Sequence, residues 1–397
     1  MNAVDPVHTM APESPDMQEC VRTTVCFPFA GDSIGGSHIS LLGLLENLDP
    51  ARFRILIVPE APNGKIAQHF KDFEQLPAPA TQQRSFTPGE AFSTRKFMRT
   101  LTGIPERVRF LREHDVDIVH TNDGRTHATW AAAARLAGSP LVWHHRADPS
   151  AMGLRLLAPL LATRVLTVSS FSLPKGKIWS AAHKAEVVFS PFDTSITVDR
   201  ASARAELLAD LDAPDDALIV GFFGSFVSRK RPLLFVDTIA ELRKMLDRPV
   251  IGVMFGEAKI PEMERKLRDH IAQTGMEDAV RLMGFRKPGH KWIGACDQLL
   301  VPATGEPLGR TLVEAMLVRT PVVATRSGGN PEALAGGTGV LVEPESASAL
   351  AKGVSNLLFN PSECERMLDR AQPSARDRFG KECHAATVTR IYEELAS

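Results

Sequence analysis

Short apolar runs alternate with longer segments of helical periodicity along most of the chain. In the first half, strand patterns occur at residues 25–30, 54–60, 116–122, 140–145, 165–170 and 186–191. Short apolar runs separated by helices are typical of parallel strands that are covered on both faces. The pattern therefore predicts a doubly wound α/β domain, with helices on both sides of a parallel sheet.

The same pattern restarts in the second half, after a polar stretch rich in Ala, Asp and Pro at 199–216. Further strand patterns occur at 217–226, 249–257, 279–285, 297–303, 320–325 and 339–344. We therefore expect two Rossmann-like domains, residues 21–198 and 199–380, and a C-terminal helix at 381–397 that packs back on the first domain. Ligands should bind in the cleft between them, at the carboxyl ends of the strands.

Two segments fall outside this pattern. The first 19 residues contain three prolines, four acids and no Lys or Arg. They lack the basic start and the apolar stretch of a signal peptide, and we interpret residues 1–20 as a disordered tail. Residues 76–94, with three prolines among small polar residues, predict a flexible loop.

Composition narrows the function classes. The 397 residues include 46 Lys and Arg and 47 Asp and Glu, a net charge of −1 that lacks the basic excess of a dedicated nucleic-acid binder. The five cysteines form no CxxC pair, so neither a disulfide framework nor a zinc site is predicted, which fits a reducing, cytoplasmic compartment. No apolar run reaches the ~18 residues that span a bilayer.

The strongest candidate for chemistry is residues 303–334, where a strand, a glycine-containing loop and a helix follow one another. The first amides of a helix are unpaired and carry a partial positive charge, which suits a pyrophosphate. Glu306 precedes the helix and Glu314 lies roughly 8 Å along its axis, at ~1.5 Å per residue. A carboxylate accepts two hydroxyl hydrogen bonds, so the spacing fits a transferred sugar at Glu306 and a ribose at Glu314. Alternatively, both glutamates are solvated residues at a helix end.

Glu306 and Glu314, in EPLGRTLVE, resemble the paired-glutamate motif of family 4 retaining glycosyltransferases with the GT-B fold. The segment that follows, AMLVRTPVVATRSGGNPE, and GVLVEP at 339–344 are also similar to that family. The resemblance implies that Glu314 binds the ribose of a nucleotide sugar and that Glu306 binds the donor sugar. It also implies donor contacts from the backbone of Pro307, Leu308 and Gly309 and from Thr311.

A second candidate site is GFFGSFVSRKRP at 221–232, where a strand ends before Gly224 and three cations follow. Fixed cations suit a leaving diphosphate, which gains negative charge as the glycosidic bond breaks. The family carries an Arg directly after this glycine and a Lys five residues later. Lys230 matches the Lys, whereas Ser225 stands in place of the Arg, and either Arg229 or Arg231 replaces its charge. The alternative is a solvated basic loop.

Further candidates lie where other strands end. Gly35 and Gly36 allow backbone to approach a phosphate or an acceptor closely, or form a tight turn without a ligand. In the family, a histidine near residues 141–148 faces the donor sugar, and His144, His145 and Arg146 compete for this position. The remaining candidates of this kind are His120 and Asn122, which point toward the cleft by the strand-end rule, and Arg286, in a loop that the family places near the base.

Residues 95–113 carry six Lys and Arg and two acids, interleaved with apolar residues. The segment fits peripheral contact with an anionic membrane, and it equally fits a surface helix whose arginine stems cover apolar area.

Together these observations predict a retaining glycosyltransferase of the hexosyl type that uses a UDP- or GDP-linked sugar. The acceptor is a glycan, a lipid-linked molecule or a small molecule. Lys230, Glu306, His144 and Arg146 are the candidate catalytic residues. We expect no metal and no cofactor besides the co-substrate, because Lys230 and the helix start take the place of the cation and no DxD motif occurs.

Three alternatives remain. One is a GT-B nucleotide-sugar epimerase or phosphorylase. Another is a non-catalytic nucleotide-sugar-binding partner protein, which the Ser225 departure permits. The last is an NAD-dependent dehydrogenase, which ranks lowest because GDSIGG at 31–36 lacks the GxGxxG spacing.

Overall fold

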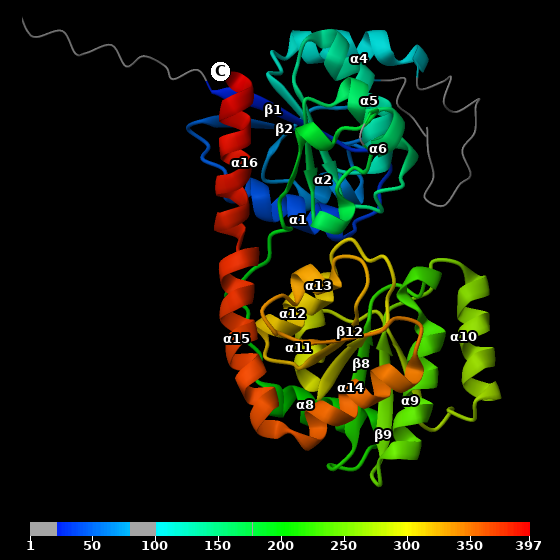
Figure 1. Cartoon of the computed structure of the whole chain (residues 1–397). Helices are drawn as coiled ribbons and strands as arrows, with labels where there is room; N and C mark the ends of the chain where they lie inside the picture. The colour runs from blue at the N-terminus through cyan, green and yellow to red at the C-terminus, as the bar shows by residue number, and fades with distance from the viewer. Residues whose placement is uncertain (1–21, 80–100, 177) are drawn as a thin grey trace, which may run out of the picture.

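The computed structural model describes residues 22–79, 101–176 and 178–397 and shows two lobes, one above the other (Figure 1). The predicted tail at 1–20, most of the predicted loop at 76–94 and residues 95–100 lie outside the described residues. Within the described residues, no helix is both long and apolar enough to cross a membrane.

The N-terminal lobe contains a parallel seven-stranded sheet with the order β3-β2-β1-β4-β5-β6-β7. The strands are β1 (Thr23–Pro28), β2 (Phe53–Val58), β3 (Glu74–Gln75), β4 (Ile118–Thr121), β5 (Leu141–His145), β6 (Arg164–Thr167) and β7 (Ala185–Val187). In the centre, Val25 of β1 pairs with Ile55 of β2 and with Ile118 of β4. Six of the strands were predicted. The edge strand β3 was not, because it has two residues and no apolar run.

The C-terminal lobe contains a parallel six-stranded sheet with the order β10-β9-β8-β11-β12-β13. The strands are β8 (Leu218–Phe223), β9 (Val250–Phe255), β10 (Val280–Gly284), β11 (Gln298–Val301), β12 (Val322–Thr325) and β13 (Val340–Val342). In both sheets the strand order reverses beside the first strand, as in doubly wound folds. The predicted fold class of two Rossmann-like domains is confirmed.

Helices cover both faces of each sheet (Figure 1). The N-terminal lobe has α1 (Gly36–Leu45), α2 (Lys65–His69), α4 (Ile104–Glu113), α5 (Gly124–Ala137), α6 (Met152–Leu156) and α7 (Ala158–Leu161). The C-terminal lobe has α8 (Arg200–Leu211), α9 (Pro232–Met245), α10 (Pro261–Gln273), α11 (Gly289–Ala295), α12 (Arg310–Leu317), α13 (Asn330–Ala333), α14 (Ala347–Phe359) and α15 (Pro361–Phe379). Short 3₁₀ turns lie at η2 (Ser170–Ser172), η3 (Ala182–Lys184) and η4 (Ser228–Lys230).

The last helix, α16 (Lys381–Ala396), lies along the N-terminal lobe, whereas α15 lies along the C-terminal lobe (Figure 1). The chain therefore crosses between the lobes twice, and the crossings are joined by a hydrogen bond of 2.8 Å from the Phe192 N–H to the Phe379 carbonyl. Tyr392 of α16 is completely buried, and its hydroxyl lies 2.5 Å from Nδ1 of His120 in β4. Docking of α16 thus completes the core of the N-terminal lobe.

The core of the N-terminal lobe holds several neutral histidines. Burial lowers the pKa of His384 from its ordinary value of 6.5 to about 3, with the nearby Arg146 charge acting in the same direction. Burial likewise lowers the pKa of His120 and His144 well below the ordinary value. The unfolded chain therefore binds more protons than the folded chain as the pH falls from 6.5, and the free energy of unfolding decreases through this window.

Replacing His384 by Asn should weaken this acid sensitivity. His384→Asn removes one group that must stay neutral, so the loss of unfolding free energy between pH 7.5 and 5 should shrink by about 2 kcal/mol. Urea unfolding at both pH values measures this difference, with the exposed His183→Asn as the control. An unchanged loss in His384→Asn would show that this histidine does not titrate on unfolding.

Candidate active site

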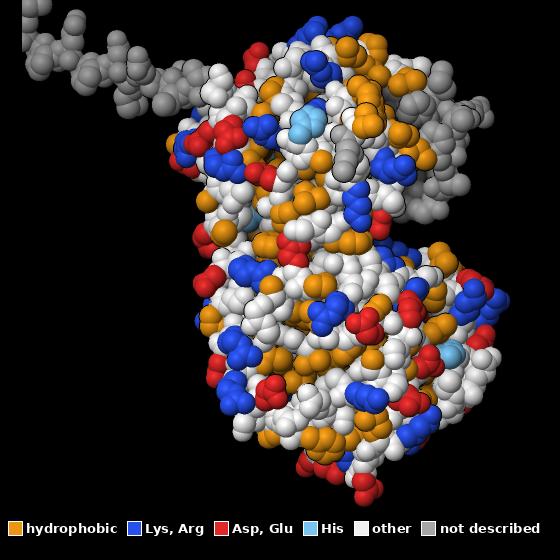
Figure 2. Space-filling model, viewed as in Figure 1, with side chains coloured by type: hydrophobic (Ala, Val, Ile, Leu, Met, Phe, Trp, Pro, Cys, Tyr) orange, Lys and Arg blue, Asp and Glu red, His pale blue; other side chains and the backbone are white. Residues whose placement is uncertain are grey.

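The carboxyl ends of both sheets face the space between the lobes, and the molecular outline is indented there (Figure 2). Two contacts join the lobes beside this space. After β6, the Ser169 hydroxyl donates a hydrogen bond to the carbonyl of Pro307. The Ser170 N–H donates to a carboxylate oxygen of Glu332 at 2.6 Å, and its hydroxyl donates to the other oxygen at 2.9 Å. These contacts hold the loop before α12 and the short helix α13 against the N-terminal lobe.

A glycine turn after β12 shapes the loop that carries Glu306. Gly328 has a φ of +63°, and a Cβ placed on it would lie 2.6 Å from the backbone nitrogen of Glu306. The next amide, of Gly329, donates a hydrogen bond of 2.7 Å to the Glu306 carbonyl. Only a residue without a side chain fits this contact, so the two glycines fix the position of Glu306.

Glu306 is 8% exposed and pairs with two cations from the β8–α9 loop. Its carboxylate accepts a hydrogen bond from Arg229 and lies 3.5 Å from Nζ of Lys230. Lys230 extends past Gly224, where a Cβ would meet its Nζ at 3.0 Å. Arg231 instead adopts a left-handed conformation and binds Glu345 at the surface. The structure therefore directs Arg229 and Lys230, and not Arg231, toward Glu306.

The charge of Lys230 also influences the pKa of the second glutamate, Glu314. Burial raises the pKa of Glu314, while the charges of Arg310 and Lys230 oppose this rise. The side chain of Glu314 is a quarter exposed, and its nearest cation is Arg310, with Nε 3.9 Å away. Glu314 lies on α12, eight residues after Glu306, so both glutamates belong to the loop and helix that follow β11.

No side chain caps the start of α12, where Gly309 occupies the N-cap position. Leu308 is buried and anchors the loop in the core of the C-terminal lobe, and Thr311 is partly exposed one residue into the helix. The helix start therefore carries no side-chain cap, with Glu306 before it in the chain and Glu314 within the helix.

Arg310 is a site residue that the sequence analysis missed. Its guanidinium donates a hydrogen bond of 2.8 Å to the Ser40 hydroxyl of α1 and lies 4.2 Å above the ring of Phe192. Gly36 makes room for it, since a Cβ there would lie 3.2 Å from Cδ of Arg310. Arg310 thus links α12 to the N-terminal lobe. The position of Arg310 within the EPLGRTLVE motif was the only sequence feature that could have indicated this role.

The structure buries both histidines that were predicted to face the donor at the end of β5. His144 is completely buried between His120 and Arg146, and His145 is 3% exposed with Nε2 at 3.0 Å from the Asp148 carbonyl. Neither histidine offers a surface to a donor in this structure. Arg146 alone of the three candidates remains partly exposed.

Arg146 is a charge without a counter-ion. It donates a hydrogen bond of 3.0 Å to Ser190, and no carboxylate pairs with it among the described residues. Burial, with the Arg310 charge acting in the same direction, lowers the pKa of Arg146 to about 9. An anionic group between the lobes would relieve this repulsion.

The other predicted residues take several positions. Ser225 is partly exposed after β8, and Gly35 faces open space at the N-cap of α1. Arg286 binds Asp210 at 2.5 Å and lies 4.9 Å from the ring of Trp292, so its guanidinium is held against α8 and α11. Asn122 is buried, with its Oδ1 unpartnered, and His120 is completely buried. In the described ranges, no group of three or more His, Cys, Asp or Glu side chains could hold a metal ion.

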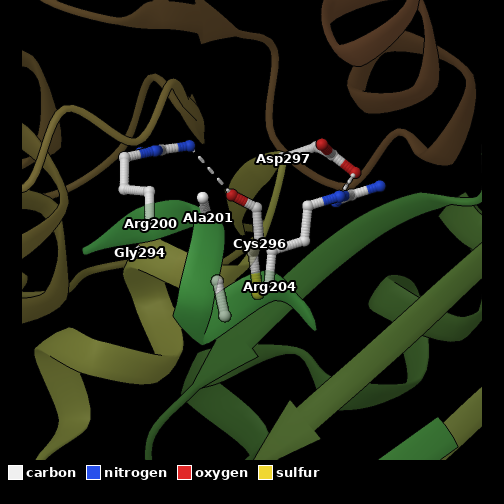
Figure 3. Close-up of a pocket in the computed structure, with 7 residues that line it drawn as sticks. Arg200, Ala201, Arg204, Gly294, Cys296 and Asp297 are labelled. Carbon is white, nitrogen blue, oxygen red and sulfur yellow. Dashed lines mark hydrogen bonds and ion pairs between the residues drawn. The ribbon is translucent and has the colours of Figure 1, made fainter. Parts of the chain in front are cut away.

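A cavity of about 210 Å³ lies between α8 and α11, remote from the glutamate pair (Figure 3). Arg200 and Arg204 line it, but Figure 3 shows their guanidinium groups directed at protein acceptors. Arg200 donates to the carbonyls of Val318, Arg319 and Cys296, and Arg204 binds Asp297 at 2.8 Å. Both arginines therefore join elements of the C-terminal lobe, and the cavity offers no free cation to a ligand.

Comparison with known proteins agrees with this geometry. Residues 203–373 match the family model described as Glycosyl transferases group 1. The D-inositol 3-phosphate glycosyltransferase of Streptomyces coelicolor is 35% identical over 205 residues, which are 48% of this chain and 43% of the relative. The chain thus aligns with less than half the length of that relative. The enzyme of the same name from Streptomyces scabiei is 27% identical over 92% of this chain and 87% of its own length.

A similar solved structure is Anabaena HepE in complex with UDP, with a TM-score of 0.76 and 22% identity. The match covers 94% of this chain and 100% of HepE. The likeness concerns the fold, and it extends over both lobes.

Substitution of Gly328 by Ala tests how the Glu306 loop is positioned. The new methyl group would collide with the Glu306 backbone and displace the loop, so nucleotide-sugar affinity should fall at least tenfold. Gly336→Ala is the matched control, because Gly336 also has a positive φ (77°) but faces open space. Both variants carry a similar backbone penalty of about 1 kcal/mol. Equal affinities of the two variants, measured by calorimetry, would contradict the packing argument.

Proposed function

We propose that this chain, a family 4 glycosyltransferase with the GT-B fold, transfers a sugar from a nucleoside-diphosphate sugar to an acceptor hydroxyl with retention of configuration. The observation that carries the proposal is the pairing of Arg229 and Lys230 with Glu306, directly before the uncapped start of α12, the helix that carries Glu314. This arrangement suits a ligand with hydroxyl groups at two points and a diphosphate between them.

The donor would bind by replacing protein ion pairs. Without donor, Glu306 is neutralised by Arg229 and Lys230. The diphosphate would attract both cations, and the released carboxylate of Glu306 would accept hydrogen bonds from the sugar hydroxyls. Glu314 would accept those of the ribose. Arg229 would thereby supply the positive charge that the family's Arg provides at the position of the uncharged Ser225.

The cations and helix amides that bind the diphosphate would also stabilise it as the leaving group. When the bond between the anomeric carbon and the phosphate oxygen breaks, the nucleoside diphosphate leaves with the electron pair. Lys230, Arg229 and the first amides of α12 face this charge. The acceptor oxygen would bond to the anomeric carbon on the same face, and its proton would pass to a phosphate oxygen. No separate general base is required.

The first acceptor to test is a phosphorylated cyclitol. The curated relatives from Streptomyces are named D-inositol 3-phosphate glycosyltransferases. An anionic acceptor would also suit Arg146, which has no carboxylate partner and faces the Arg310 charge. A UDP-linked sugar is the first donor to test, since HepE is described in complexes with UDP and UDP-glucose.

Glu314→Gln should lower the affinity for the nucleotide sugar by one to two orders of magnitude. The substitution keeps the shape of the side chain and removes a charged acceptor, and a hydrogen bond to a charged group contributes about 1.5–3 kcal/mol. Titration calorimetry with UDP, GDP and ADP sugars measures the effect. Glu345→Gln, at the exposed partner of Arg231, serves as the control and should bind normally. Equal affinities in both variants would rule out the ribose contact.

Lys230→Ala should reduce kcat by about a hundredfold or more and change donor affinity much less, because the charge it faces develops as the bond breaks. Steady-state kinetics against the highly exposed Lys244→Ala control separates the two effects. A defect that appears in KM alone would mean that Lys230 only binds the ground state.

A further inference from the structure

A stripe of apolar side chains on the N-terminal lobe has no partner among the described residues. Met152, Leu156 and Leu160 recur every four residues along α6 and α7, and each is more than half exposed. Leu154 and Ala158 are buried on the opposite side, which anchors both helices. Figure 2 shows hydrophobic side chains gathered over the region that α5 and α6 occupy in Figure 1.

The loop after η2 adds to this stripe. Ile178 is completely exposed, and Trp179 is 57% exposed. Two hydrogen bonds tie the following turn, η3, to α7: Nζ of Lys184 donates to the carbonyls of Pro159 and Ala162 at 2.9 and 2.8 Å. We call the surface formed by Met152, Leu156, Leu160, Ile178 and Trp179 the α6–α7 patch.

Exposed cations lie on and next to the segments that form the α6–α7 patch. Arg155, between the patch residues of α6, and Lys175, in the loop after η2, are both exposed. Other cations of this region are engaged elsewhere, Arg164 with Glu394 and Lys184 with two backbone carbonyls. Apolar anchors beside exposed cations complement an anionic bilayer.

The basic segment at 95–113 is a weaker candidate for the same contact. In its described part, Phe110 of α4 packs 5.9 Å from the ring of Trp130, and Arg107 lies 6.0 Å over that ring. Leu111 is also buried. The apolar side of α4 is therefore already covered by α5, whereas no element in the described part of the chain covers the α6–α7 patch.

The α6–α7 patch lies close to the candidate active site. α6 starts a few residues after Asp148, and Phe171 belongs to the turn before Trp179. A Cβ placed on Gly305 of the Glu306 loop would lie 3.7 Å from Phe171 and 4.0 Å from Asp148. A surface that contacted the patch would thus lie beside the opening between the lobes.

We propose that the α6–α7 patch binds the surface of an anionic phospholipid bilayer, with Trp179 at the interface. Tryptophan suits this position because its ring is amphipathic. The inference does not depend on the transferase activity, since adsorption requires neither donor nor acceptor. Binding should weaken with salt, because the basic residues contribute through screened interactions.

Trp179 offers a direct probe. The chain has four tryptophans, and the other three, Trp130, Trp143 and Trp292, are buried. The full chain is mixed with vesicles of phosphatidylglycerol and phosphatidylcholine that contain brominated lipid. The account predicts quenching of part of the tryptophan emission, and no such quenching in Trp179→Phe. Quenching that persists in Trp179→Phe, or that is absent from the unsubstituted protein, overturns the proposal.

Flotation with the same vesicles tests the rest of the surface. The double variant Leu156→Glu/Leu160→Glu should bind at least tenfold more weakly than the unsubstituted protein. Phe359→Glu is the matched control, because Phe359 is equally exposed but lies at the end of α14 in the other lobe. Circular dichroism shows whether each variant is folded.

Three further results would overturn the proposal. The first is equal binding to vesicles of phosphatidylcholine alone, which would remove the role of charge. The second is normal flotation of the double variant. The third is a dimer in light scattering that the double variant abolishes, which would assign the patch to a second copy of the chain. None of these readouts involves sugar transfer, so they are distinguishable from a failure of the proposed function.

Discussion

The site depends on the placement of positive charge at the start of α12. Glu306 and Glu314 are both partly withdrawn from water, and an isolated carboxylate in such a position loses hydration energy. Lys230 and Arg229 offset this loss at Glu306, and Arg310 with Lys230 does so at Glu314. A ligand that brings its own negative charge and hydroxyl groups can replace these internal pairs. Under the proposed function, these cations would already be in place when a diphosphate binds.

Packing keeps these charges in place. Gly328 and Gly329 press against the Glu306 loop from the C-terminal lobe, while Ser169 holds Pro307 from the N-terminal lobe. Arg310 extends from α12 to Ser40 across the same boundary. A change in the angle between the lobes must therefore alter the loop that carries Glu306. The geometry couples movement of the lobes to the donor site.

The sequence predicted the sheets well, because twelve strands are short apolar runs that a doubly wound fold buries on both faces. It missed Glu74–Gln75, because this strand has only two polar residues and pairs with β2 through the backbone and an ion pair between Arg54 and Glu74. In the site, it predicted the glutamate pair and Lys230 from their local spacing. It could not decide whether Arg229 or Arg231 replaces the missing charge, because only the left-handed backbone at Arg231 turns that side chain outward. It also favoured His144, since the end of a strand indicates the edge of the sheet but not the burial of a side chain. The role of Arg310 could not be predicted, because it rests on a hydrogen bond to Ser40, which lies 270 residues away along the chain.

The most direct measurement of the central claim is the structure of this protein in complex with a nucleoside diphosphate. The account predicts density for the diphosphate at the first amides of α12, with Glu314 at the ribose. Arg229 and Lys230 should have turned from Glu306 to the phosphate oxygens. A diphosphate bound elsewhere, with the ion pairs of Glu306 intact, would contradict the account.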